Sequence, residues 1–161
     1  MDFTGYFRTL DGRECWPLTI ADPFSRRLIG VRALARPRGE WARAACEKAF
    51  HACGVPRVIR TDNGEPFAGS GIGRLSRLSV WWMKQRIRVD RIDPGKPQHN
   101  GRHERMHGVL KQETAYPPAS SLAVHRHVFA AWTRSKLGES SWTRCSTGAI
   151  SSSTAAWPPR F

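Results

Sequence analysis

The chain has 161 residues, 40% of them hydrophobic, which is enough for one folded domain with a single core. Lysine and arginine number 26 against 13 acidic residues, and the net charge of +13 favours a polyanion, most commonly nucleic acid, as partner. There is no apolar run long enough for a membrane span and no signal-peptide pattern, so we expect a cytoplasmic protein without membrane association. The 4 cysteines form no C-x-x-C pair and are typical of reduced thiols.

The order of periodic segments predicts a mixed α/β domain. The turn at Asp11-Gly12 joins two loosely alternating segments, and a third strand follows the turn at residues 22–25, which indicates an antiparallel meander. Helices and strands then alternate, and this change predicts a mixed sheet covered by helices. The glycine-rich residues 65–73 predict a mobile loop. The predicted strands are residues 2–8, 14–21, 28–34, 55–61 and 87–92, and the predicted helices are residues 40–53, 74–86, 98–114 and 120–136.

Three acidic residues lie at the ends of predicted elements. Asp62 follows a strand in the turn segment Thr-Asp-Asn-Gly at residues 61–64. This is where α/β sheets place reactive groups, although Asp62 alone fits a turn cap equally well. Asp2 begins the first strand, and Glu104 lies at the front of a helix. Asp22 is a rival to Asp2 that ranks lower, because the following proline places it in a turn.

The order of these motifs resembles that of a known family. Asp2, then Thr-Asp-Asn-Gly at residues 61–64, then Asn-Gly-x-x-Glu at residues 100–104, is similar to the catalytic core of retroviral-type integrases and bacterial insertion-sequence transposases of the DDE class. The resemblance runs from Asp2 to about residue 119. It implies a ribonuclease-H-like fold, with a mixed five-stranded sheet in which a three-strand antiparallel meander precedes parallel strands, flanked by helices.

The resemblance also implies a function and a catalytic triad. Asp2, Asp62 and Glu104 would hold two Mg²⁺ or Mn²⁺ ions for metal-dependent DNA cleavage and strand transfer. The implied partners are DNA, as element ends and as target, and further copies of the chain on that DNA, in a bacterial nucleoid.

DNA contacts are implied near the same helix. The family commonly has a DNA-contacting basic residue seven positions after this glutamate, where the chain has Lys111, and another at four positions, where it has Gly108. This glycine departs from the family pattern. The remaining DNA-binding candidates are Asn100, Arg74, Arg77, Arg102 and Arg105.

Two alternatives stay open. His103-Glu104-Arg105-Met106-His107 matches H-E-x-x-H, the pattern of a zinc metallohydrolase in which both histidines bind the metal. That interpretation explains neither the Thr-Asp-Asn-Gly segment nor the net charge of +13. The second alternative is an inactive DNA-binding transposase remnant, because parts that the family usually has are missing at both ends.

The predicted domain boundary is residue 132. Residues 1–132 are expected to form the integrase-like core, without the helix-turn-helix region that the family has upstream. Residues 133–161 are rich in serine and threonine and have no apolar period. We therefore expect them to be an atypical tail that is disordered or translated out of frame.

Overall fold

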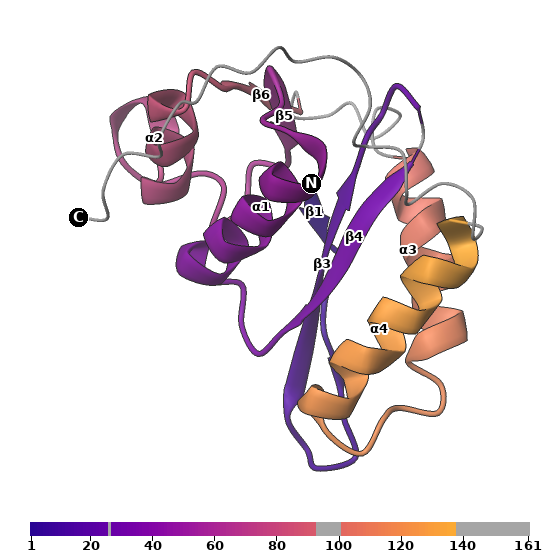
Figure 1. The fold of residues 1–161 in the computed structure, drawn as a ribbon. Coiled ribbons are helices and arrows are strands. Elements are labelled where there is room, and N and C mark those ends of the chain that lie inside the picture. Colours follow the sequence, from indigo (N-terminus) through magenta and orange to yellow (C-terminus); the bar gives the residue numbers. More distant parts are fainter. Residues whose placement is uncertain (26, 93–100, 138–161) are drawn as a thin grey trace.

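The computed structural model describes residues 1–25, 27–92 and 101–137 (Figure 1). The strands are β1 (Asp2–Phe3), β2 (Phe7–Arg8), β3 (Glu14–Ala21), β4 (Leu28–Leu34), β5 (Val58–Thr61) and β6 (Arg88–Arg91). The helices are α1 (Gly39–Cys53), the 3-10 helix η1 (Ile72–Arg74), α2 (Arg77–Lys84), α3 (Gly101–Thr114) and α4 (Leu122–Leu137).

β3 is the centre of a four-stranded sheet, because it pairs antiparallel with β1, β2 and β4. β5 and β6 form a parallel pair, in which Val58 lies opposite Arg88 and Thr61 opposite Arg91. Helices α1 and α2 lie on one side of the four-stranded sheet, and α3 and α4 lie on the other (Figure 1). The domain is therefore built in three layers with a core on each face of the sheet.

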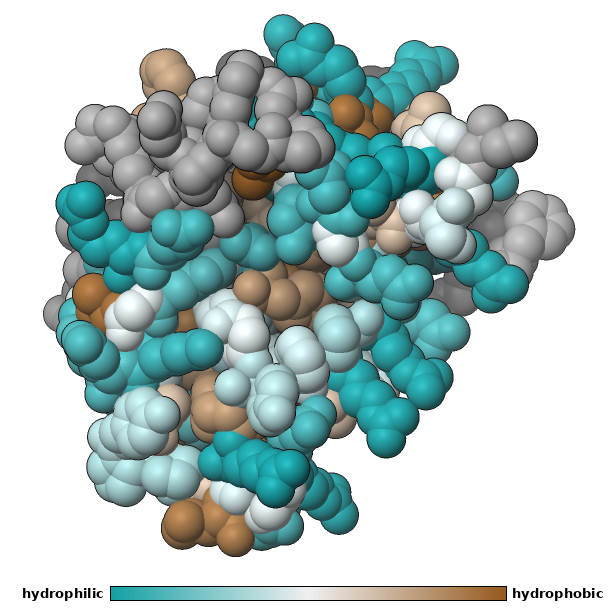
Figure 2. All heavy atoms as spheres, turned by 180° about the vertical axis from the view of Figure 1, so that it is seen from behind, coloured by the Kyte–Doolittle hydropathy of each residue, from teal (hydrophilic) through white to brown (hydrophobic). Residues whose placement is uncertain are grey.

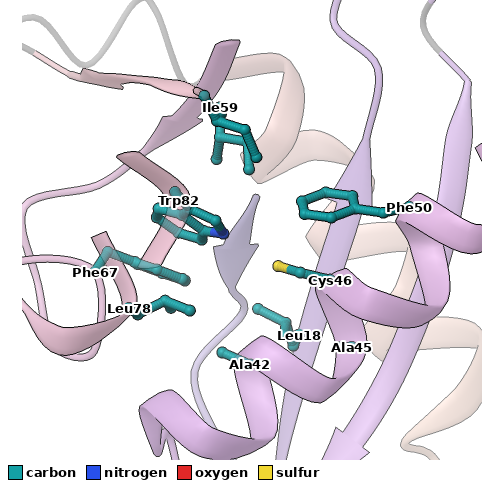
Figure 3. Packing of buried hydrophobic residues seen from close by; sticks show 10 residues of the cluster. Leu18, Ala42, Ala45, Cys46, Phe50, Ile59, Phe67, Leu78 and Trp82 are labelled. Carbon is teal, nitrogen blue, oxygen red and sulfur yellow. The ribbon is translucent and has the colours of Figure 1, made fainter. Parts of the chain in front are cut away.

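Alternation along β3 assigns its side chains to these two cores. Leu18 packs on the side of α1, α2 and β5, in a cluster that includes Phe50 and the fully buried Trp82 (Figure 3). Cys15 packs on the side of α3 and α4, in a cluster that includes Leu110 and Phe129. The two cores fix the helices against opposite faces of the same strand.

The predicted mixed α/β architecture is confirmed, but the predicted single five-stranded sheet is divided into the antiparallel sheet of β1–β4 and the separate parallel pair of β5 and β6. The first predicted strand is also interrupted. Residues 2–8 were expected to form a continuous strand, but the chain leaves the sheet between β1 and β2, where Gly5 has a φ of 73°. This left-handed conformation is available to glycine at little cost. Both halves of the interrupted strand still pair with β3.

The predicted helix over residues 74–86 is wrong at its N-terminal end. Arg74 belongs to η1, and α2 begins only at Arg77. The reason is a reciprocal cap: the N–H of Ser79 donates to the hydroxyl of Ser76 at 3.1 Å, and the N–H of Ser76 donates to the hydroxyl of Ser79 at 2.8 Å. The predicted helix over residues 98–114 is confirmed from Gly101 onward, and residues 98–100 lie outside the described part.

Helix α4 passes the predicted domain boundary at residue 132 and continues to Leu137. Thr133 is buried, and its hydroxyl donates to the Phe129 carbonyl at 2.7 Å. Lys136 forms an ion pair of 2.8 Å with Glu113 of α3. Residues 133–137 are thus part of the folded domain, and the rest of the predicted tail, residues 138–161, lies outside the described residues.

The face seen from behind is mostly hydrophilic, and its hydrophobic residues form small patches separated by polar ones (Figure 2). None of the helices in the described ranges is long and apolar enough to cross a membrane.

Candidate active site

Asp62 follows β5 directly, and its two neighbours fix the turn that carries it. The side-chain amide of Asn63 donates to the Ile92 carbonyl at 2.6 Å, which ties the turn to the end of β6. The N–H of Gly64 donates to Oδ1 of Asp62 at 3.3 Å, and a Cβ at Gly64 would lie only 3.2 Å from Oδ2. Asn63 therefore anchors the turn, and Gly64 leaves room for the carboxylate.

The start of β1 lies beside the end of β5. The ammonium group of Met1 donates to the Arg60 carbonyl at 2.8 Å, next to Asp2 on one strand and close to Asp62 on the other. Burial, and after it the charge of Asp2, raise the pKa of Asp62 above its ordinary value. Two carboxylates that are 60 residues apart in sequence (62 − 2) thus share one corner of the domain.

Thr19 connects this corner to α3. It lies directly opposite Asp2 in the β1–β3 ladder, so the two side chains occupy the same face of the sheet. The Thr19 hydroxyl donates to the Asp2 carbonyl at 3.1 Å and lies 2.9 Å from Nε2 of His107 on α3. Phe3 points to the opposite face, where its ring centroid lies 5.6 Å from that of Phe67. The Asp2 side chain therefore belongs to the face that α3 covers.

One face of α3 follows β1 and the turn after it. Glu104 precedes His107 by three residues and Lys111 follows it by four, spacings that place all three on one side of the helix. The ammonium group of Lys111 lies 3.4 Å from the point where a Cβ of Gly5 would be. Glu104 is exposed at the front of this face, one helical turn from the Thr19 contact.

The predicted DNA-binding residues do not form one group. Arg105 is exposed on α3, next to Glu104 in sequence, whereas Arg74 and Arg77 are exposed at η1 and at the start of α2, in the other helical layer (Figure 1). Asn100 and the side chain of Arg102 lie outside the described residues.

Comparison with known proteins identifies the family of the chain. A family model described as integrase core domain matches residues 1–97, and a second model with the same description matches residues 85–135. The chain belongs to the integrase core domain family.

Two curated relatives of this integrase core are insertion-element proteins. The insertion element IS476 uncharacterized 39.2 kDa protein of Xanthomonas euvesicatoria is 30% identical over 136 residues, which cover 83% of this chain and 37% of the relative. The insertion element IS407 uncharacterized 31.7 kDa protein of Burkholderia multivorans is 27% identical over 123 residues, which cover 76% of this chain and 42% of the relative. The chain thus spans about two fifths of the length of these relatives.

Solved integrase structures have the same fold. The HTLV-2 integrase catalytic core domain in complex with magnesium, in its trimeric form, has a TM-score of 0.61 at 19% identity, covering 85% of this chain and 84% of that chain. The simian T-cell lymphotropic virus intasome in complex with PP2A regulatory subunit B56 gamma has a TM-score of 0.57 at 23% identity, covering 70% of this chain and 38% of that chain. The predicted ribonuclease-H-like fold class is confirmed.

The acids of this integrase core fit a hard divalent cation. Carboxylate oxygens are the ligands that Mg²⁺ and Mn²⁺ prefer. Asp2 and Asp62 would hold a divalent cation, whose positive charge would offset both the burial and the repulsion that raise the pKa of Asp62. Within residues 1–25, 27–92 and 101–137, no three His, Cys, Asp or Glu side chains are gathered as a metal site, so Glu104 is not closed onto the acidic pair.

Asp22, the rival of Asp2, caps its own turn. The hydroxyl of Ser25 donates to its carboxylate at 2.6 Å, and the N–H groups of Phe24 and Ser25 donate at 3.1 and 3.2 Å. These bonds, the Ser25 hydroxyl foremost, lower the pKa of Asp22. The integrase core thus uses Asp22 for local structure.

His107 weighs against the zinc alternative. Its side chain is only 8% exposed, and its Nε2 is in hydrogen-bond contact with Thr19. The side chain of His103 lies outside the described residues. Sequence reasoning missed the role of Thr19 because the two partners are 88 residues apart, and the H-E-x-x-H pattern pointed to a metal instead.

Proposed function

We propose that the chain is the catalytic core of an insertion-sequence transposase, which cuts the ends of its element and joins them to target DNA as a homo-oligomer in the bacterial cytoplasm. Its family and its similarity to insertion-element proteins support this proposal. The observation that carries it is the meeting of Asp2 and Asp62 where the start of β1 lies beside the end of β5.

In the proposed reaction, Asp2, Asp62 and Glu104 hold the divalent cations. When bound, two such ions supply activation of water or of a 3′-hydroxyl and stabilisation of the leaving oxygen. In strand transfer, the 3′-oxygen of the element forms a bond to a target phosphorus. The bond from that phosphorus to its original 3′-oxygen breaks, and the released oxygen takes up a proton. Asn63 holds Asp62 in place for this exchange.

The charge of the chain supports DNA as substrate. A net charge of +13 favours phosphate contacts that are independent of sequence. Lys111 and Arg105 lie on α3, the helix of Glu104, where a DNA strand that reaches the acids would pass. We expect them to position phosphates rather than to read bases.

Metal binding tests the acidic site directly. Mn²⁺ added to the chain and followed by electron paramagnetic resonance should bind to the parental protein, and Asp62→Asn should lower the affinity about tenfold or more. Asp22→Asn is the matched control, because it makes the same change in a turn outside the site and should leave the affinity unaltered. An Asp62→Asn variant that binds Mn²⁺ as well as the parental chain contradicts the proposal. DNA binding without Mn²⁺ binding supports the inactive remnant instead.

A further inference from the structure

Two buried polar residues connect the strand of one acid to the helix of another. We propose that Thr19 and His107 are positioning residues that hold Glu104 in register with Asp2. The inference rests on the proposed function, because it concerns the distance between two acids of that site.

The contact is a short chain of hydrogen bonds between three elements. Thr19 is fully buried on β3, and its hydroxyl lies 3.1 Å from the Asp2 carbonyl and 2.9 Å from Nε2 of His107. A hydroxyl has one proton and two lone pairs. When the proton goes to the carbonyl of Asp2, the ring of His107 donates through its Nε2–H to the Thr19 oxygen. His107 is then a donor to the sheet, and Nε2 is not a lone-pair ligand for a metal.

This contact supplies what the apolar packing of α3 does not. Leu110 is buried in the core shared with α4, and Met106 packs against the same core. Apolar burial is non-directional, so these contacts constrain the rotation of α3 and its shift along its axis only loosely. A hydrogen bond is directional, and the bond to Thr19 fixes both.

Because Glu104 lies on the same helix, the constraint on the rotation and shift of α3 also positions Glu104. It lies three residues before His107, about 4.5 Å along the axis and on the same face. Asp2 lies opposite Thr19 in the ladder. One hydrogen-bonded pair therefore sets the spacing of the two acids, and it gives the second histidine of the H-E-x-x-H pattern a role without zinc.

Four variants test the pair. Thr19→Val keeps the size of the side chain and removes the hydroxyl, and His107→Leu removes the ring nitrogen. His107→Gln keeps an N–H near the position of Nε2 and should restore most of what His107→Leu loses. Thr133→Val is the matched control, because Thr133 is another buried threonine, and its hydroxyl bonds within α4.

Two measurements on the full chain separate positioning from folding. Mn²⁺ affinity should fall about 10- to 100-fold in Thr19→Val and in His107→Leu and recover in His107→Gln, as for residues that orient metal ligands. Without metal, amide hydrogen exchange in α3 should be faster in Thr19→Val and in His107→Leu than in the parental chain. Exchange in α4 should be unchanged in both variants. Thr133→Val should change neither the Mn²⁺ affinity nor the exchange of α3.

The outcomes distinguish this inference from the proposed function. Unchanged exchange in α3 for Thr19→Val and His107→Leu overturns the inference, whatever the metal result. Faster exchange in α3 with unchanged Mn²⁺ affinity also overturns it, because the pair is then structural only. A parental chain that binds no Mn²⁺ contradicts the proposed function and, with it, a role of the pair in metal positioning.

Discussion

Asp2 and Asp62 bring two negative charges together where the start of β1 lies beside the end of β5. Burial and the charge of Asp2, in that order, raise the pKa of Asp62. Asp22 is the opposite case, because the bonds from Ser25 and Phe24 lower its pKa. The ionised carboxylate is thus unfavourable for the folded state at Asp62 and favourable at Asp22, which gives the two residues opposite expected effects on stability.

Replacing each aspartate by asparagine should show this difference. At pH 7 without divalent metal, Asp62→Asn should raise the free energy of unfolding by about 1 kcal/mol, because the neutral amide removes repulsion and keeps an acceptor for the Gly64 N–H. Asp22→Asn should lower it by about 0.5 kcal/mol, since the turn is mostly exposed. Urea denaturation followed by tryptophan fluorescence measures both. A destabilised Asp62→Asn contradicts the account of this corner.

His125 predicts a dependence of stability on pH. It is fully buried on α4 between Phe7 and Phe129, with ring centroids 4.7 and 4.5 Å away, and neither ring nitrogen has a hydrogen-bond partner among the described residues. Burial lowers its pKa from the ordinary value of 6.5. The unfolded chain therefore binds a proton at higher pH than the folded chain does. Stability should be full above pH 6.5 and should fall as the pH drops from there toward the folded pKa.

The slope of the free energy of unfolding against pH identifies the group that causes the loss of stability. One proton taken up on unfolding changes the free energy of unfolding by at most about 1.4 kcal/mol per pH unit. In urea denaturation at a series of pH values below 6.5, His125→Phe should have a smaller slope than the parental chain. His127→Phe, an exposed position on the same helix, is the control and should keep the parental slope. Equal slopes for the parental chain and His125→Phe would show that another group is responsible.

The sequence predicts the helices and strands of the fold better than it predicts the residues at which they begin and end. Alternation along residues 14–21 and the turn before residues 28–34 were sufficient to predict β3 and β4, whose bounds the structure reproduces. The break at Gly5 was missed because an interrupted strand has the same alternation on either side of the break. The start of α2 was missed because Ser76 with Ser79 is an uncommon form of the reciprocal cap, which usually has Glu or Gln at the later position.

The same limit applies to the candidate site. Asp62 was identified from its turn, because Asp, Asn and Gly are local turn residues. Its approach to Asp2 depends on which strands are neighbours, and only the resemblance to a family supplied that. The contact of Thr19 with His107 joins residues 88 positions apart and follows from no local pattern. The triad itself stays a prediction, since the side chains described do not close Glu104 onto the pair.

DNA binding should weaken steeply with salt. A substitution that removes one phosphate-binding side chain should reduce the slope of the logarithm of affinity against the logarithm of salt concentration by about one. Lys111→Ala should produce this change, because the residue lies on the Glu104 face of α3. Lys48→Ala, which removes an exposed lysine from α1 in the other layer, is the control. Fluorescence anisotropy of a labelled duplex at several salt concentrations measures the slopes, and an affinity independent of salt contradicts a phosphate-dominated interface.

Zinc content separates the two metal chemistries. The chain purified without chelator should hold far less than one equivalent of Zn²⁺, because Nε2 of His107 is engaged by Thr19. Mass spectrometry of metals measures this directly. One equivalent of Zn²⁺ that is lost in both His103→Ala and His107→Ala would favour the zinc metallohydrolase.

Joining of labelled element ends to plasmid DNA in Mn²⁺ tests the central claim most directly. The labelled ends are the terminal inverted repeats that the proposed function expects in the DNA on either side of the gene, and the parental chain is compared with Asp62→Asn and Asp22→Asn. We expect the parental chain and Asp22→Asn to join ends. Asp62→Asn should lose at least about 10³-fold in rate while still binding DNA, because the acids of one metal site act as a unit. Joining by Asp62→Asn at the parental rate would contradict the account.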